Sequence, residues 1–357
     1  MLKRTYLLLI AIFVPLCFSF HPSVAAEESL KISVIPPGPY EIAIGTNAWK
    51  IYLDGTIEAG AEKRVEREIS RISNSVIEVY INSHGGDFLT GIKLGHLFRA
   101  KSAWTHIGRQ GAGATANPGE CYSACAIAYL GGYYRFGISG SKYGVHRTWK
   151  DGAAKNSDLD DGQIISAAIG AYIREMGVDS RLLDLTVTAG KNQIYILSES
   201  EQKTLGVVNE GRAPSEWSIQ MQQGLVYLRG TQNTMYGAGK FLLFCADRKL
   251  ILHSIYEAGI ASSENVVRGD WFHSLWTDGK TTALSAPIQS VNDNGYLNTN
   301  FSLSRKQAML ILAARESVGH TMQVTREAPT FIGYRVDLAS AARRQLREFI
   351  SACMPTE

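Results

Sequence analysis

Ile81-Asn-Ser-His-Gly-Gly-Asp87 is the stretch that decides the fold of the N-terminal part of this chain. It follows an apolar run, residues 76–81, that predicts a strand, and it precedes residues 88–100, which predict a helix. Glycine suits a tight turn because a residue without Cβ adopts positive φ and lets other groups approach the backbone. The sequence therefore predicts a glycine turn at the carboxyl end of a strand, where open α/β sheets bind ligands.

Two further segments supply the groups that a serine nucleophile needs. Cys121-Tyr-Ser-Ala-Cys125 places Ser123 before an apolar segment of small residues that predicts a buried helix, and Tyr143-Gly-Val-His-Arg147 supplies His146. A serine hydroxyl needs a base to take its proton, and the oxyanion that forms needs N–H donors already in place. At the start of the predicted helix, the N–H of Ala124 would be a free donor.

Each of these features also has an ordinary structural interpretation. Two glycines after a strand commonly form a plain turn, a serine before a helix commonly caps it, and a single histidine on a strand is commonly structural. His84, His96 and His106 match no spacing of metal ligands, so we expect no metal site. The order of glycine turn, serine and histidine along the chain is what favours a catalytic site.

These residues resemble the ClpP/crotonase superfamily and, within it, the ClpP-like serine peptidases. The resemblance covers residues 50–209 and rests on Ile51-Tyr-Leu-Asp-Gly-Thr-Ile57, Tyr80-Ile-Asn-Ser-His-Gly-Gly86, Ser123-Ala-Cys125 and Gly144-Val-His146. The chain is similar to a branch of bacterial exported proteins with a Cys-x-Ser-Ala-Cys nucleophile region. The resemblance implies an α/β fold, a ClpP/crotonase-like spiral of β-α-β units.

The resemblance also implies a role for each residue of the site. Ser123 stands where the family has its nucleophile, and His146 stands where the family has its base. The N–H groups of Gly86 and Ala124 stand where the family has its oxyanion donors. His84 replaces the proline of the family's glycine turn.

The acidic third member of the family's triad has no counterpart in this sequence. Ile194 occupies its position. The interpretations left open are a Ser-His dyad, an orienting role for Asn192 or Asp184 toward His146, and an inactive site. Loss of the orienting group need not abolish activity, because oxyanion stabilisation and substrate binding survive it.

We therefore expect an exported peptidase that hydrolyses peptide bonds by a Ser-His mechanism, with a peptide or protein as substrate and no cofactor. One alternative is a weak or inactive protein that keeps the ClpP fold and binds peptides, and the missing acid favours it. Another is acyl chemistry on thioesters, which crotonase relatives perform with the same paired N–H donors but without a Ser-His pair. A homo-oligomer is also compatible with the sequence.

The first 26 residues predict a secretory leader. Lys3 and Arg4 form a positive region, residues 6–20 form an apolar core, and Val24-Ala25-Ala26 supplies the small residues before a cleavage site. The alternative is an uncleaved membrane anchor, for which the apolar core is short compared with the ~20 residues of a span. We expect a periplasmic or secreted protein of Gram-negative-type export that contacts a membrane only through an uncleaved leader.

Length, charge and cysteine usage agree with an exported protein of two domains. The chain has 357 residues, 45% of them hydrophobic, and its net charge of +3 does not indicate binding to nucleic acid. Cys17 lies in the leader, and the other cysteines form an even set in a compartment where disulfides persist. We expect the pairs Cys121–Cys125 and Cys245–Cys353, with buried free thiols as the alternative.

The predicted organisation is a leader at 1–26, a ClpP-like domain at 27–212 and a smaller α+β domain at 213–357. In the last domain we expect strands at 224–229, 240–245, 249–254, 296–303, 321–326 and 331–337, and helices at 304–317 and 339–352. Arg343, Arg344 and Arg347 predict a solvated helix face. The domain shows no nucleophile, metal or phosphate-binding motif, so its function cannot be inferred from the sequence.

Overall fold

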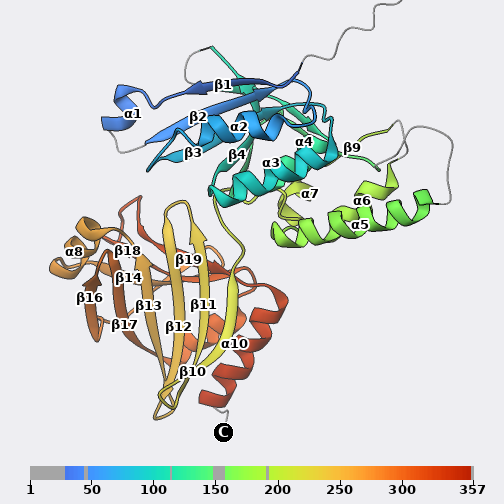
Figure 1. The fold of residues 1–357 in the computed structure, drawn as a ribbon. Helices are drawn as coiled ribbons and strands as arrows, with labels where there is room; N and C mark the ends of the chain where they lie inside the picture. Colours follow the sequence, from blue (N-terminus) through green and yellow to red (C-terminus); the bar gives the residue numbers. More distant parts are fainter. Residues whose placement is uncertain (1–28, 44–46, 113–114, 148–156, 190–192, 355–357) are drawn as a thin grey trace, which may run out of the picture.

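A computed structural model describes residues 29–43, 47–112, 115–147, 157–189 and 193–354 as a mixed α/β structure with several sheets. The predicted leader and Asn192 lie outside these residues. Buried apolar side chains form two separate clusters, one within residues 30–207 and one within residues 228–353. We call residues 29–209 the N-terminal half and residues 216–353 the C-terminal half (Figure 1). The domain boundary at residues 212 and 213 stays a prediction.

The main sheet of the N-terminal half is parallel in its centre. The parallel strands are β2 (Ala48–Asp54), β3 (Val76–Asn82), β4 (Trp104–Gln110) and β7 (Tyr134–Gly137). The antiparallel strands are β1 (Lys31–Ile35) beside β2 and β5 (Ala116–Pro118) beside β4. Parallel neighbours need crossover connections. Helix α2 (Ala61–Ile69) connects β2 to β3, and α3 (Phe88–Ala100) connects β3 to β4; both lie on one face of the sheet (Figure 1).

A smaller sheet lies beside the main one and leads to the helix that follows Ser123. Its strands are β6 (Glu120–Tyr122), β8 (Lys142–Val145) and β9 (Tyr195–Ile196). The remaining helices of this half are α1 (Pro39–Ala43), α4 (Ala124–Leu130), α5 (Ser157–Glu175), α6 (Arg181–Thr188) and α7 (Glu199–Thr204). The helices predicted at 88–100 and 124–130 are confirmed as α3 and α4.

Helices α3 and α4 approach one another through glycines. A Cβ on Gly91 would lie 2.6 Å from the carbonyl oxygen of Ala124, and a Cβ on Gly131 would lie 2.1 Å from that of Gly95. Contacts this short exclude any side chain at these positions. The backbones therefore pack directly on each other, and α3 sets the position of α4.

Arg135 on β7 holds the ends of three helices together. Its side chain is buried, and it donates to the carbonyl oxygens of Leu130 at 3.2 Å, Met176 at 3.3 Å and Gly206 at 2.7 Å. These carbonyls end or follow α4, α5 and α7, where helix dipoles place partial negative charge. Burial lowers the pKa of the Arg135 guanidinium to about 10, so the group stays charged at neutral pH.

The C-terminal half consists of two antiparallel sheets and three helices. One sheet contains, in spatial order, β10 (Glu216–Gln222), β11 (Leu225–Thr234), β12 (Gly237–Ala246), β13 (Lys249–Glu257), β17 (Tyr296–Leu303) and β16 (Gln289–Asp293). The other contains β15 (Lys280–Ala283), β14 (Phe272–Thr277), β18 (Ser317–Gln323) and β19 (Ile332–Asp337). The helices are α8 (Ile260–Arg268), α9 (Arg305–Ala313) and α10 (Ser340–Cys353).

Several elements of the C-terminal half differ from the sequence prediction. The strand expected at 321–326 begins earlier, at Ser317, and the helix expected to reach residue 317 ends at Ala313. The cause is Asp278, whose carboxylate accepts the N–H groups of Arg315 at 2.7 Å and Ser317 at 2.9 Å and so draws this backbone out of the helix. Strands β10, β14, β15 and β16 and helix α8 were not predicted.

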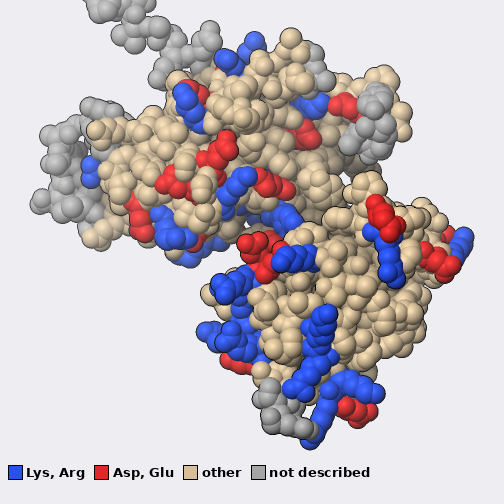
Figure 2. Space-filling view, turned by 180° about the vertical axis from the view of Figure 1, so that it is seen from behind, with Lys and Arg blue, Asp and Glu red and all other residues tan. Residues whose placement is uncertain are grey.

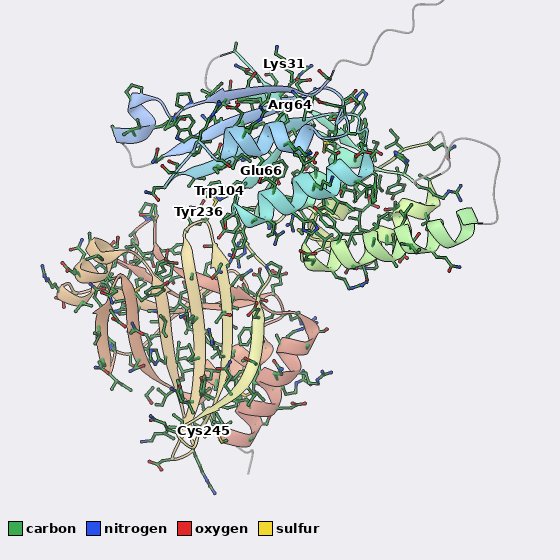
Figure 3. All side chains as sticks on the ribbon, viewed as in Figure 1. Lys31, Arg64, Glu66, Trp104, Tyr236 and Cys245 are labelled. Carbon is green, nitrogen blue, oxygen red and sulfur yellow. A yellow bond between two sulfur atoms is a disulfide. The ribbon has the colours of Figure 1, made fainter. Side chains whose placement is uncertain are left out.

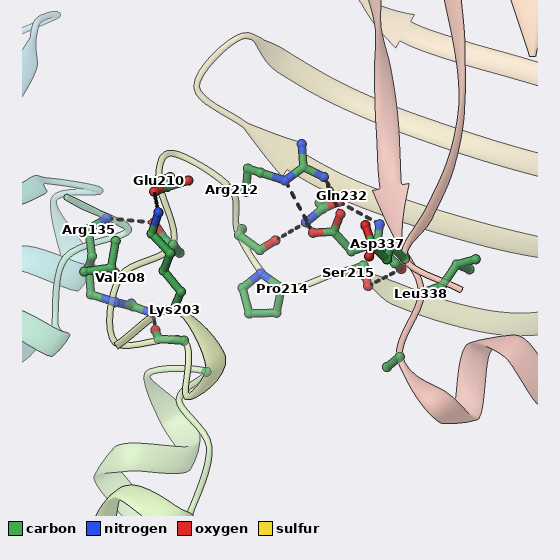
Figure 4. A pocket seen from close by; sticks show the side chains of 16 residues that line it. Arg135, Lys203, Val208, Glu210, Arg212, Pro214, Ser215, Gln232, Asp337 and Leu338 are labelled. Atoms are coloured by element: carbon green, nitrogen blue, oxygen red, sulfur yellow. Dashed lines mark hydrogen bonds and ion pairs between the residues drawn. The ribbon is translucent and has the colours of Figure 1, made fainter. Parts of the chain in front are cut away.

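The two halves meet around the connecting segment 209–215. The N–H groups of Asn209 and Glu210 both donate to the carbonyl oxygen of Arg135 at 3.1 Å. Arg212 forms an ion pair of 2.7 Å with Asp337 on β19. Figure 4 shows these residues around a cavity of ≈ 440 Å³ between the halves.

A hairpin of the C-terminal half also reaches the N-terminal half. Asn233 near the end of β11 donates to the hydroxyl of Tyr133 at 2.9 Å. Figure 3 shows Tyr236 at the tip of this hairpin, near Trp104 in that view, and Cys245 at the opposite end of the C-terminal half. None of the helices in the described residues is both long and apolar enough to cross a membrane.

Acidic and basic side chains are interspersed over the N-terminal half on the face that Figure 2 shows. The basic residues Arg343, Arg344 and Arg347 are exposed on α10, as expected of a solvated helix face.

Replacing Arg135 tests its role in the N-terminal half. Arg135→Met should lower the free energy of unfolding of this half by about 3 kcal/mol, because several buried carbonyls lose a charged donor. Urea denaturation followed by circular dichroism measures the change. Arg109→Met, at an exposed position on β4, is the control and should change it little. Equal effects of the two substitutions would contradict the role assigned to Arg135.

Candidate active site

Ser123 lies at a sharp junction between β6 and α4. Its backbone has φ 57 and ψ −122, a conformation that residues other than glycine rarely adopt. Its side chain makes no capping hydrogen bond to α4, so the interpretation of Ser123 as a simple helix cap is wrong. A strained serine between a strand and a helix presents its hydroxyl away from the chain, as nucleophilic serines require.

The glycine turn after β3 packs against Ser123. Gly85 has φ 114, and a Cβ placed on it would lie 2.7 Å from the Ser123 Cβ and 3.2 Å from the Ala124 nitrogen. The N–H of Tyr122 donates to the Ser83 carbonyl at 3.0 Å, so the turn and β6 are joined by hydrogen bonds. Only glycine at position 85 permits this approach.

Two N–H groups beside Ser123 remain available for a ligand. The neighbours of Gly86 bond to Ile57, with the Ile57 N–H donating to the Gly85 carbonyl at 2.9 Å and the Asp87 N–H donating to the Ile57 carbonyl at 2.7 Å. Within the described residues, the N–H groups of Gly86 and Ala124 have no protein acceptor. Ala124 begins α4, where the helix dipole favours negative charge. These are the two groups expected to form an oxyanion hole.

His146 and Ser123 each follow the end of a strand in the smaller sheet. Strands β6 and β8 are parallel and pair Tyr122 with Gly144, so Ser123 and His146 both follow the carboxyl ends of neighbouring strands. The Ser123 N–H also donates to the Gly144 carbonyl at 3.3 Å. The structure therefore brings the two expected catalytic residues to the same sheet edge.

A backbone carbonyl orients the His146 ring. Nδ1 lies 2.9 Å from the carbonyl oxygen of Arg147, which can only accept a hydrogen bond. A neutral ring that donates from Nδ1 to this carbonyl carries on Nε2 the lone pair that a general base needs.

In the structure, an apolar side chain lies where the acidic residue of a complete triad is expected. Strands β8 and β9 are antiparallel and pair Val145 with Tyr195, and continuing this register by one residue places Ile194 opposite His146. The Ile194 side chain is 44% exposed. Of the residues considered as alternative orienting groups, Asn192 lies outside the described residues and Asp184 is exposed on α6.

A polar group beside the serine was not anticipated from the sequence. His84 Nε2 lies 2.9 Å from a Glu120 carboxylate oxygen, and its ring stacks on Tyr122 at 5.3 Å. Lys142 donates to the same carboxylate at 2.8 Å and lowers the pKa of Glu120. Tyr122 in turn directly precedes Ser123 in the chain. No local pattern indicates this cluster, since its members come from three separate segments.

The remaining histidines of the N-terminal half have structural surroundings. The His106 ring stacks between Tyr80 at 4.4 Å and Phe136 at 4.9 Å, and burial lowers its pKa to about 3. His96 lies 3.4 Å from Glu175. In the part of the chain that the structure describes, no three His, Cys, Asp or Glu side chains are grouped to hold a metal ion.

Two disulfides form in the pairs expected from the sequence. Cys121–Cys125 encloses Ser123, with a Cα–Cα distance of 5.2 Å, and connects β6 to the first turn of α4. Cys245–Cys353 connects β12 to the end of α10. The first bridge braces the strained serine from both sides.

Removing the disulfides one at a time should show which of them supports the candidate site and which only stabilises the fold. Replacing both Cys121 and Cys125 by alanine should slow reaction of Ser123 with a fluorophosphonate by roughly 10- to 100-fold, because small displacements of a nucleophile are costly. Replacing both Cys245 and Cys353 should lower thermal stability but leave the labelling rate of folded protein unchanged. Equal labelling of the two variants would argue against support of the site by the first bridge.

No protein-family profile and no curated protein sequence match this chain. Solved structures that match include ClpP1 from Listeria monocytogenes, at 20% identity and a TM-score of 0.36 over 45% of this chain and 88% of that one. A mutant of the same ClpP1 matches at 22% identity and 0.34 over the same shares. A mutant of the 1510-N membrane-bound stomatin-specific protease matches at 14% identity and 0.33, over 43% of this chain and 75% of that one.

Proposed function

We propose that this protein is a serine peptidase in which Ser123 is the nucleophile and His146 the general base. The observation that carries the proposal is the backbone of Ser123, which is held in a rare conformation directly against a glycine turn. Such strain costs about 1–3 kcal/mol and persists where the surrounding structure enforces it, most often at functional sites. A plain turn or a helix cap would not need it.

The proposed chemistry gives each of these groups one role. His146 Nε2 takes the Ser123 proton while Oγ attacks the carbonyl carbon of a peptide bond. The N–H groups of Gly86 and Ala124 donate to the oxyanion of the tetrahedral intermediate. The protonated His146 then gives its proton to the leaving amine, and water activated by the same ring hydrolyses the acyl-enzyme.

The Arg147 carbonyl has the orienting role that a carboxylate has in a complete triad. It holds the His146 tautomer, but a neutral carbonyl stabilises the imidazolium less than a carboxylate does. Losing the carboxylate from a triad costs about 10⁴ in turnover, so we expect slow hydrolysis. An additional contribution from Asn192 stays a prediction.

Export and assembly belong to the same proposal. The two disulfides are consistent with an oxidising compartment, and the predicted leader would deliver the chain there. We propose a periplasmic or secreted protein acting on peptides or proteins, with homo-oligomerisation open to measurement.

A peptide-binding protein without turnover is the second candidate function. The placement of Ile194 opposite His146 favours it, because an apolar side chain cannot stabilise a charged imidazolium. This candidate keeps the site as a binding groove and predicts that Ser123 does not form acyl-enzymes.

Fluorophosphonate labelling of the mature protein tests the peptidase. Ser123→Ala should abolish labelling, and His146→Ala should slow it at least about 100-fold because the base is lost. Mass spectrometry locates the adduct.

The controls are Ser302→Ala at an exposed position on β17 and His96→Ala on α3, which should label like the wild type. Undiminished labelling of His146→Ala would remove that residue as the base. A wild-type protein that binds peptides but never labels would favour the binding function.

A further inference from the structure

Four segments of the C-terminal half meet at the end that points away from the N-terminal half (Figure 1). Two of them are the tight turns of neighbouring hairpins, β10–β11 and β12–β13. The other two are the start of α9 and the end of α10. We call this region the distal end, and it consists of residues 221–226, 246–249, 304–306 and 351–354.

Strand register and a disulfide hold these segments side by side. Continuing the register of β11 and β12 by two residues places Leu225 opposite Ala246. Strand β17 ends beside β13 at Leu303, and α9 begins directly after it. The Cys245–Cys353 disulfide joins the end of α10 to β12. Residues far apart in the sequence therefore form one surface at the distal end.

Both hairpin turns have a defined and tight backbone. The two central residues of each turn have positive φ, with Gln223 at 51 and Gly224 at 81 in one turn and Asp247 at 51 and Arg248 at 56 in the other. Two positive φ values are typical of type I′ turns, whose twist matches that of the flanking strands. The side chains of the distal end therefore project from a firm support.

The β10–β11 hairpin exposes apolar side chains at its tip. Met221 is 73% exposed, and Leu225 and Val226 are each 45% exposed. Met221 and Val226 pair with one another on the face of the sheet that carries the buried Leu228, but the core ends before it reaches them. Leu225 lies on the other face, so the tip is apolar on both sides.

Basic side chains lie beside this apolar tip. The neighbouring turn and the start of α9 contribute exposed basic residues, namely Arg248, Lys249, Arg305 and Lys306. None of the four forms an ion pair with another residue that the structure describes. Asp247 is the only acidic residue in the sequence of the four segments. The distal end therefore combines an excess of positive charge with exposed apolar groups.

A bilayer with anionic headgroups matches both of these properties. Basic residues attract anionic lipids, and apolar side chains on the same surface enter the boundary between headgroups and acyl chains. A soluble polyanion would contact the charges but leave the apolar side chains in water. A second copy of this chain in a symmetric contact would bring its own basic residues against those of the first.

We propose that the distal end docks on an anionic lipid bilayer as a peripheral membrane contact. Met221, Leu225 and Val226 insert below the headgroups, while Arg248 and Lys249 contact the lipid phosphates. This contact needs neither the activity proposed for the N-terminal half nor an uncleaved leader, which was the only membrane contact expected from the sequence.

The same geometry holds the N-terminal half away from the bilayer. The strands of the larger sheet run from the distal end toward the N-terminal half (Figure 1). Strand β12 has 10 residues and is therefore about 33 Å long. A chain docked in this way presents its candidate active site to the solvent rather than to the lipid.

Sedimentation with vesicles tests the proposal on the mature chain, because the apolar leader would itself bind lipid. This chain should bind vesicles of equal parts phosphatidylglycerol and phosphatidylcholine at least about tenfold more tightly than vesicles of phosphatidylcholine alone. Added salt should weaken the binding because it screens the charges. Equal binding to the two kinds of vesicle, or binding to neither, would overturn the proposal.

Two double variants separate the charged and the apolar contributions. Arg248→Glu combined with Lys249→Glu should weaken binding to the anionic vesicles at least about tenfold, because attraction becomes repulsion. Met221→Ser combined with Leu225→Ser should weaken it about tenfold, because less apolar surface enters the bilayer. If the serine pair does not fold, Met221→Ser alone takes its place.

Matched controls carry the same kinds of change away from the distal end. Lys63→Glu combined with Lys101→Glu alters exposed residues of the N-terminal half, and Ile260→Ser alters an exposed residue at the opposite end of the larger sheet, beside Gly295. Circular dichroism shows that each variant is folded, and the controls should bind vesicles like the wild type. Controls that lose as much binding as the distal variants would refute the assigned surface. Loss of binding in the glutamate pair but not in the serine variant would indicate a site for a soluble polyanion and refute docking on lipid.

Discussion

The buried guanidinium of Arg135 is the interaction on which the N-terminal half depends. It donates hydrogen bonds to carbonyl oxygens at the ends of α4, α5 and α7. Its own backbone carbonyl accepts hydrogen bonds from the segment that leads to the C-terminal half. Arg99 donates to several of the same carbonyls, including that of Leu130 at 3.3 Å. Helix ends that would otherwise bury unsatisfied acceptors are thereby fixed in one place.

The candidate active site is supported from both ends of α4. Arg135 holds the carboxyl end of this helix, while the Cys121–Cys125 bridge and the glycine turn hold its start. The unusual backbone of Ser123 can persist only under such constraint, because relaxation would otherwise remove the strain. Packing of α3 on α4 through Gly91 adds a further restraint, since neither helix can shift without a backbone clash.

The C-terminal half illustrates why contacts between side chains of different strands could not be predicted. Ser254, His273 and His320 come from three different strands, and no spacing in the sequence connects them. Each residue alone is an ordinary strand residue. Only the packing of the two sheets brings His320 within hydrogen-bonding distance of both Ser254 and His273.

The sequence by itself determined the features that depend on neighbouring residues. These are the glycine turn, helices α3 and α4, the start of the helix α9 beside Ser304, and the pairing of cysteines within each half. Steric freedom, hydrophobic period and capping act over a few residues, so they can be read along the chain. Tertiary structure alone decided the strain at Ser123 and the His84–Glu120 contact. It also decided the end of α9 at Ala313, because the Asp278 carboxylate accepts the N–H of Arg315. These depend on groups that are distant in sequence, and folding the sheets is what brings them within hydrogen-bonding distance.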